Sequence, residues 1–180
     1  MTMYICGWDL STRLCGYCVL DDTGKYIDIG HIELKKIKNE YDKLETIKRF
    51  LISKQTLFEK CEHYVEAPLL AFKAKSSMAV TIGKLQRING QICLLIYLLF
   101  NKKSVPVYVS TARKLCGIVL PKKSKRKDTK KLILNFVQNL GIVPKEKWTY
   151  KRTGNPSDFC FDQADAYVVA ASQIISKNNI

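Results

Sequence analysis

The first 34 residues constrain the fold more than any other segment, because they contain three strand-like runs in succession. Residues 3–8 form a short apolar run that ends at Asp9 and a Leu-Ser-Thr turn, as a buried strand does. Residues 16–20 and 25–34 flank the turn cluster Asp-Asp-Thr-Gly, a hairpin pattern. We therefore expect three antiparallel strands at the start of the chain, with Asp9 at the carboxyl end of the first.

Helices and strands alternate through the rest of the chain. The patterns predict a helix from Tyr41 behind an Asn39 N-cap, a strand at 63–66 and a long helix capped by Ser76 or Ser77. An edge strand at 105–109, a linker and a helix follow. A helix ending at Gly141 and a final helix starting at 156–158 complete the chain. This order describes an α/β domain with a five-stranded mixed sheet flanked by helices. It resembles the order of the ribonuclease H-like fold. We expect residues 1–180 to form a single domain, because this length suits one core.

The net charge of +14 favours a polyanionic partner such as nucleic acid. The longest apolar stretch, residues 92–100, is far shorter than the roughly 20 residues that cross a bilayer, so no membrane partner is expected. The N-terminus lacks the regions of a secretory signal, and the seven cysteines are scattered through apolar segments. Both features predict an intracellular protein with reduced thiols.

Four acidic residues occur where α/β folds usually assemble ligand sites. Asp9 and Glu66 end predicted strands, while Asp162 and Asp165 are three residues apart on one face of the last helix. Each alone has an ordinary explanation, as a turn former, a strand-end charge or an acid at a helix N-terminus. Brought together, they would repel one another unless cations neutralised them, and hard divalent ions prefer oxygen ligands.

These acids predict a site for two Mg²⁺ ions, with Mn²⁺ as a substitute. Two ions, typically about 3.5 to 4 Å apart, can activate a water and stabilise the leaving oxygen of a phosphodiester. Such hydrolysis requires no histidine. We accordingly expect His31 and His63, both in predicted strands, to be structural.

Several segments resemble the RuvC-type Holliday-junction resolvases, including phage, viral and organellar enzymes. The similar segments are Ile-Cys-Gly-Trp-Asp-Leu-Ser-Thr at 5–12, Tyr-Val-Glu-Ala-Pro at 64–68, Lys-Leu-Gln-Arg-Ile-Asn-Gly at 84–90, the basic run at 122–131 and Phe-Asp-Gln-Ala-Asp-Ala-Tyr at 161–167. The resemblance implies a homodimer that nicks symmetry-related strands of a four-way DNA junction. It also implies that Asp9, Glu66, Asp162 and Asp165 are the catalytic metal ligands.

Two further segments allow alternative interpretations. Met78, Ile82, Leu85, Asn89, Ile92 and Ile96 repeat by four and three, which indicates either a core helix or a helix that pairs with its copy in a dimer. The loop after Glu66 differs from the bacterial pattern. Leu70 or Phe72 is our candidate for a wedge that opens the junction, and packing on the partner subunit is the alternative.

Basic residues before and within the helix that ends at Gly141 are candidates for phosphate contacts. They are Lys122, Lys123, Lys125, Arg126, Lys127, Lys130 and Lys131, with Lys73, Lys75 and Arg113 as secondary candidates. The alternative is a solvated helix face. The sequence leaves two other functions open: a ribonuclease H-fold nuclease for RNA:DNA hybrids, flaps or forks, or a non-catalytic DNA-binding module.

Overall fold

The computed structural model describes residues 3–67, 76–121 and 125–178, without the side chains of 76–78 and 126. Its strands are β1 (Tyr4–Leu10), β2 (Leu14–Asp21), β3 (Tyr26–Glu33), β4 (Cys61–Glu66) and β5 (Ser104–Val107). Its α-helices are α1 (Glu40–Ser53), α2 (Gln55–Phe58), α3 (Ser76–Phe100), α4 (Val109–Leu115), α5 (Arg126–Leu140) and α6 (Asp158–Asn178), and a 3₁₀ turn, η1, spans Lys145–Lys147. No helix in the described ranges is long and apolar enough to span a membrane.

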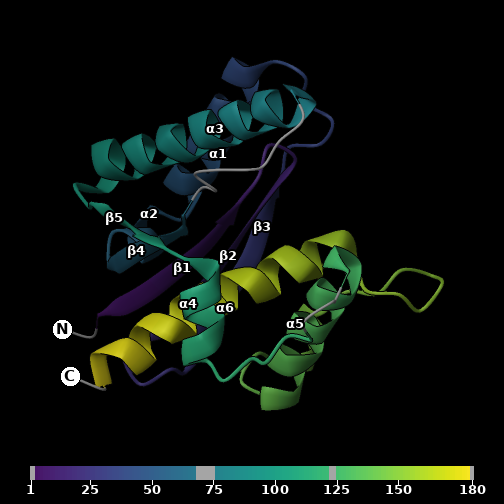
Figure 1. Cartoon of the computed structure of the whole chain (residues 1–180). Helices are drawn as coiled ribbons and strands as arrows, with labels where there is room; N and C mark the ends of the chain where they lie inside the picture. Colours follow the sequence, from purple (N-terminus) through teal and green to yellow (C-terminus); the bar gives the residue numbers. More distant parts are fainter. Residues whose placement is uncertain (1–2, 68–75, 122–124, 179–180) are drawn as a thin grey trace.

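The five strands form one mixed sheet in the order β3-β2-β1-β4-β5 (Figure 1). β1 pairs antiparallel with β2, and β2 with β3, while β4 pairs parallel with β1 and β5 parallel with β4. The expected mixed sheet with three antiparallel strands at its start is therefore confirmed. β5 is an edge strand, which tolerates Pro106 because proline lacks the N–H that a second neighbour would need.

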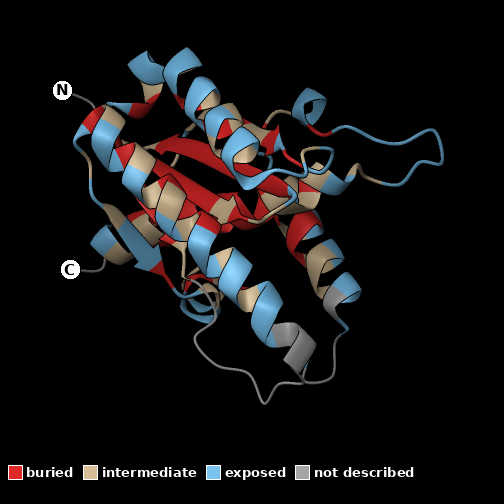
Figure 2. Ribbon diagram, turned by 90° about the horizontal axis from the view of Figure 1, so that it is seen from above, coloured by how far each residue is buried: buried red, intermediate tan, exposed pale blue. Residues whose placement is uncertain are grey.

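Helices cover both faces of the sheet, and its central strands β1 and β2 are largely buried between them (Figures 1 and 2). Because side chains alternate along a strand, β1 directs Cys6, Trp8 and Leu10 to the core shared with α1 and α3. Ile5 points to the opposite core, which α4, α5 and α6 complete. Gly7 and Asp9 lie on this second face, under α6.

His63 is a structural residue, as expected. It is fully buried, accepts a hydrogen bond on Nδ1 from Trp8 Nε1 at 3.2 Å, and has Nε2 2.9 Å from the Phe58 carbonyl oxygen. Burial lowers its pKa to about 4, so the neutral ring that satisfies both contacts is the stable form. His31 lies on β3, where its ring stacks on Phe159 with 4.0 Å between centroids.

Several predicted boundaries are confirmed and two need correction. The Asn39 side chain accepts a hydrogen bond from the Tyr41 N–H at 2.8 Å, and Gly141 ends α5 with a φ of 66°. The strand predicted at 105–109 is wrong at its end, because β5 stops where its only partner, β4, stops, and a helix starts at Val109. β1 extends to Leu10 because β2 pairs with it that far, so Asp9 is the penultimate residue of the strand.

The proposed dimer seam on α3 is wrong for Ile92 and Ile96, because both are fully buried against the chain's own sheet. The alternative interpretation, a core helix, is correct for this stripe. Asn89 donates a hydrogen bond from Nδ2 to the Glu66 carbonyl oxygen at 3.1 Å. Ile82 and Leu85 are partly exposed, and the Met78 side chain lies outside the described part.

The long helix α6 lies unusually close to β1 and β2. A methyl group added at Gly7 would come within 2.5 Å of the Ala170 backbone nitrogen, and one at Gly16 within 2.9 Å of the Gln163 nitrogen. Glycine is therefore required at both positions because the helix backbone occupies the space of a side chain. The first half of α6 is consequently fixed in depth and position over the centre of the sheet.

Gly7→Ala should destabilise the protein by about 2 kcal/mol or more, because either the methyl group or the α6 backbone must move. Gly83→Ala is the matched control, because a methyl group at this position meets nothing within 4 Å. The substitution also replaces a glycine inside a helix. It should stabilise by up to about 1 kcal/mol. Urea unfolding of both variants tests this, and equal stability of the two would contradict the close approach.

Candidate active site

Three acidic side chains from distant parts of the sequence converge above the sheet. Ligand oxygens of Asp9, Asp162 and Asp165 all lie within 4.8 Å of one another. Asp9 pairs across the ladder with Gly16, and the first turns of α6 pass directly over that glycine. The absence of a side chain at Gly16 thus allows Asp162 and, one turn later, Asp165 to approach Asp9.

Glu66 joins this group through Asp9. β4 runs parallel to β1 and ends at Glu66, so the two acids lie at the same end of neighbouring strands. The Asp9 and Glu66 side chains line the same cavity walls and interact electrostatically, because, in addition to burial, the charge of Glu66 raises the pKa of Asp9. The hydrogen bond from Asn89 to its backbone oxygen ties this strand end to α3. The four predicted acids therefore form one cluster, although the 4.8 Å group contains only the three aspartates.

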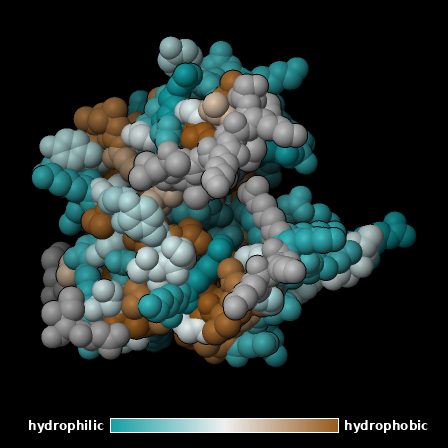
Figure 3. All heavy atoms as spheres, viewed as in Figure 1, coloured by the Kyte–Doolittle hydropathy of each residue, from teal (hydrophilic) through white to brown (hydrophobic). Residues whose placement is uncertain are grey.

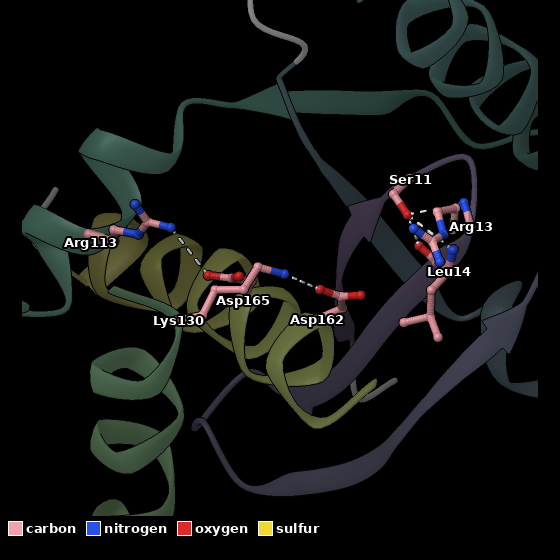
Figure 4. A network of polar contacts seen from close by, with 7 residues as sticks. All are labelled: Ser11, Arg13, Leu14, Arg113, Lys130, Asp162 and Asp165. Atoms are coloured by element: carbon pink, nitrogen blue, oxygen red, sulfur yellow. Dashed lines mark hydrogen bonds and ion pairs between the residues drawn. The ribbon is translucent and has the colours of Figure 1, made fainter. Parts of the chain in front are cut away.

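Two basic side chains compensate part of the negative charge (Figure 4). Lys130 of α5 forms an ion pair with Asp162, and Arg113 of α4 donates from a guanidinium nitrogen to Asp165 Oδ1 at 3.3 Å. Both were predicted as DNA contacts, and their ion pairs place them beside the acids. Two cations among four carboxyl groups leave the cluster with excess negative charge.

The pKa values of Asp9, Glu66 and Asp165 reflect their burial and the excess of negative charge. Burial raises the pKa of Asp9 well above its usual range, and the charges of Glu66, Asp165 and Asp162 raise it further. Burial also raises the pKa of Glu66 and of Asp165. Burial is the largest single effect on Lys130 and lowers its pKa, but the combined attraction of Asp162, Asp9 and Asp165 outweighs it, so the pKa of Lys130 is raised. Clustered carboxylate oxygens with unbalanced charge are the donor set that suits a hard divalent cation.

The acids separate two cavities that together form one groove. A smaller cavity of about 480 Å³ and a larger one of about 1230 Å³ share Asp9, Ser11, Glu66, Ala67, Leu85 and Lys130 in their walls. The smaller arm continues along Arg13, Glu33, Lys35 and Asp158, and the larger arm along α3 and α4. An extended polymer could follow this groove past the acids in either direction.

The other residues predicted to contact DNA are either exposed on α5 or lie outside the described part of the chain. Lys125, Lys127 and Lys131 are exposed at and after the start of α5, close in sequence to Lys130. Their role in DNA binding stays a prediction. Leu70, Phe72, Lys73, Lys75, Lys122 and Lys123, and the side chain of Arg126, lie outside the described residues.

Gly7 and Gly16 are the site residues that sequence reasoning missed. Their signal was present, because a glycine inside a strand of bulky apolar residues often marks a close approach of another backbone. Both strands were recognised, but the approaching segment could not be identified from a local pattern. The sequence placed Asn89 in a stripe of either a core helix or a dimer helix, and did not indicate that its side chain anchors the end of β4.

Solved structures share this arrangement of elements. Thermus thermophilus RuvC bound to a Holliday junction matches with a TM-score of 0.61 and 11% identity, over 98% of this chain and 96% of RuvC. This chain has the fold of the RuvC-type resolvases. No protein-family model matches the sequence, and no curated protein does.

One viral protein and one yeast mitochondrial protein also share this fold. The fowlpox virus resolvase, solved with Holliday-junction DNA, matches with a TM-score of 0.53 and 17% identity over 97% of this chain and 99% of its own. The yeast mitochondrial resolvase Ydc2 matches with a TM-score of 0.56 and 16% identity over 97% of this chain and 78% of its own. At these identities the similarity concerns the RuvC fold, which belongs to the ribonuclease H-like class predicted from the order of elements.

Asp9→Asn should raise the free energy of unfolding at pH 7.5 in EDTA, because it removes a buried carboxyl group with a raised pKa. An acid whose pKa is raised by folding destabilises the fold above its ordinary pKa and not below it. The gain should therefore vanish toward pH 4.

The same unfolding measurements with added Mg²⁺ test the metal site. Mg²⁺ should stabilise the wild type, and Asp9→Asn should lose most of that stabilisation. Asp22→Asn, at an exposed hairpin position, is the control that should change neither quantity. Equal stabilisation of wild type and Asp9→Asn by Mg²⁺ would contradict the site.

Proposed function

We propose that this chain is a metal-dependent endonuclease that cleaves four-way DNA junctions, acting as a homodimer with two ions in each site. The convergence of Asp9, Asp162 and Asp165, with Glu66 beside Asp9, is the observation that carries the proposal. It supports hydrolysis because such a donor set suits the divalent ions that cut phosphodiesters. The choice of a junction rests on the fold, since two matching proteins were solved with Holliday-junction DNA.

The acids would hold the ions on the floor of the groove. Bound Mg²⁺ or Mn²⁺ supplies Lewis-acid chemistry, which activates a water and stabilises the leaving oxygen of the phosphodiester. Lys130 and Arg113 hold the carboxylates of Asp162 and Asp165 at the groove floor before loading. With those carboxylates engaged by ions, both side chains would be able to contact phosphate oxygens of a bound strand.

The outer basic residues would supply affinity without sequence readout. Lys125, Lys127 and Lys131 are exposed on the helix that also carries Lys130, so a DNA backbone that enters the groove can contact both sets. Such contacts release counterions from the DNA and make binding strongly dependent on salt. The net charge of +14 supports the same conclusion for the whole chain.

A panel of substrates tests the proposed activity. The wild type should introduce paired symmetric nicks in a four-way junction with Mg²⁺ or Mn²⁺, and should cut a fork, a linear duplex and an RNA:DNA hybrid at least about tenfold more slowly. Asp9→Asn and Asp165→Asn should bind the junction but reduce cleavage by about 10³-fold or more, because each removes a metal ligand.

The outcomes separate the possible functions. Preferred cleavage of the hybrid, the fork or a flap would assign another nuclease activity on the same fold. Junction binding without cleavage under any metal condition would indicate a non-catalytic DNA-binding module. Asp22→Asn, which changes an exposed hairpin acid that lines neither cavity, is the matched control and should cut normally.

For the dimer, we propose the outer face of the C-terminal half of α3. Leu94, Tyr97 and Leu98 are 55%, 46% and 66% exposed, although they are large apolar side chains on one helix. They lie opposite the stripe that contacts the sheet, so the helix can pack against the core and a second copy at once. A two-fold axis across α3 would pair this face with itself.

Leu98→Asp should shift the protein from dimer to monomer in sedimentation equilibrium, because a charge would be buried in the interface. It should also convert paired nicks in a junction into single nicks. Ile142→Asp, which changes an exposed apolar residue outside α3, should leave the dimer intact. Persistence of the dimer in Leu98→Asp would remove α3 from the interface.

A further inference from the structure

The two arms of the groove differ in chemistry. The smaller arm is lined largely by polar and charged side chains, including Arg13, Glu33, Lys35 and Asp158. The larger arm has apolar walls, formed by Ile82, Leu85, Val109, Ile118, Val119 and Leu120. The space-filling view shows apolar side chains beside hydrophilic ones on the face that this groove crosses (Figure 3). A phosphate backbone alone does not require such apolar walls.

Tyr108 is the single aromatic side chain among the described residues that line either arm. It lies between the end of β5 and the start of α4, and it is 58% exposed. Val119, beyond the other end of α4, is 84% exposed and lines the same arm. Two large apolar groups thus face solvent at the ends of the short helix that carries Arg113.

Positive charge accompanies this apolar arm. Arg113, Lys114 and Lys130 line it together with Tyr108, while its negative groups are those of the acid cluster. An occupant must therefore be flat or apolar in one part and anionic in another. A nucleotide has this combination, because its base has planar aromatic faces that stack on apolar and aromatic side chains and its phosphate carries charge.

We infer that the larger arm takes the base of a nucleotide unstacked from its helix, with Tyr108 as the stacking platform, next to the phosphate held at the acids. This inference rests on the proposed function and specifies its substrate further. A base in a continuous duplex is stacked on both neighbours and cannot enter the arm, whereas branch points release bases from stacking at lower cost. Tyr108 would then act as a positioning and specificity residue.

The position of Tyr108 permits a clean substitution. It is the N-cap residue of α4, but its side chain makes no capping hydrogen bond, and its ring is largely in solvent. Replacing it should therefore leave the fold intact. Tyr41, which is 80% exposed in the first turn of α1 and lines neither arm, is the matched control for loss of an exposed tyrosine.

The test is a coupling measurement between the ring and a single base. Binding of a synthetic four-way junction is measured by fluorescence anisotropy in EDTA, so that the DNA stays intact. Wild type, Tyr108→Phe, Tyr108→Leu, Tyr108→Ala and Tyr41→Ala are compared on the intact junction and on junctions with one abasic nucleotide at successive positions around the cut site.

Tyr108→Ala and Tyr108→Leu should weaken binding by about 5- to 100-fold, and Tyr108→Phe and Tyr41→Ala by less than about twofold. At one position, removing the base should weaken junction binding by the wild type by a factor similar to that of Tyr108→Ala. Binding by Tyr108→Ala should not weaken further when that base is removed. The inference would be overturned if Tyr108→Ala or Tyr108→Leu bound the intact junction as tightly as the wild type does. It would also be overturned if the losses of affinity from Tyr108→Ala and from the abasic nucleotide added at every position.

The inference and the proposed function fail separately. Metal-dependent junction cleavage without coupling at Tyr108 overturns the inference and leaves the nuclease in place. Coupling at Tyr108 in a chain that cuts nothing supports the base-binding arm and overturns the nuclease. A peptide that competes with DNA for the arm without any base coupling would assign the arm to a protein partner and overturn the inference.

Discussion

The contact between the backbone of α6 and two strand glycines is the constraint on which the rest of this structure depends. Gly7 and Gly16 leave room for the helix to lie directly on β1 and β2, and alanines of α6 keep the contact close. The helix then approaches Asp9, which lies on the same face of β1 as Gly7. A helix held at the usual distance by larger side chains would carry Asp162 and Asp165 out of reach of Asp9.

This arrangement stabilises the fold through packing and destabilises it through charge. Four carboxyl groups share a partly buried space, and burial together with their mutual repulsion raises the pKa of Asp9. Lys130 and Arg113 offset part of the repulsion, but each pairs with an acid of α6 and neither pairs with Asp9. The remaining negative charge is the physical reason to expect affinity for cations, and an active site is where such strain persists.

The two arms of the groove bear on which substrate the protein takes. In the proposed function the acids at its centre would fix the position of a phosphate, and the two arms would impose different requirements on either side of it. A charged arm accommodates a regular backbone, while an apolar arm with one aromatic side chain favours a base that has left its stack. Selectivity for branched DNA would thus arise from the cost of unstacking a base, with no need for sequence-specific contacts.

The sequence by itself determined the strand order and the main helices, the start of α1 and the end of α5, because these depend on local periodicity and caps. Residue chemistry also singled out the four acids that the fold brings together. It did not decide which side of α3 faces the core, because Leu94 and Ile96 are both apolar and only the position of the sheet distinguishes them. It also did not reveal that Lys130 and Arg113 pair with the acids, or that Tyr108 and Asp9 line one groove. Those facts follow from contacts between residues far apart in the chain, and such contacts exist only once the sheet and its helices have packed together.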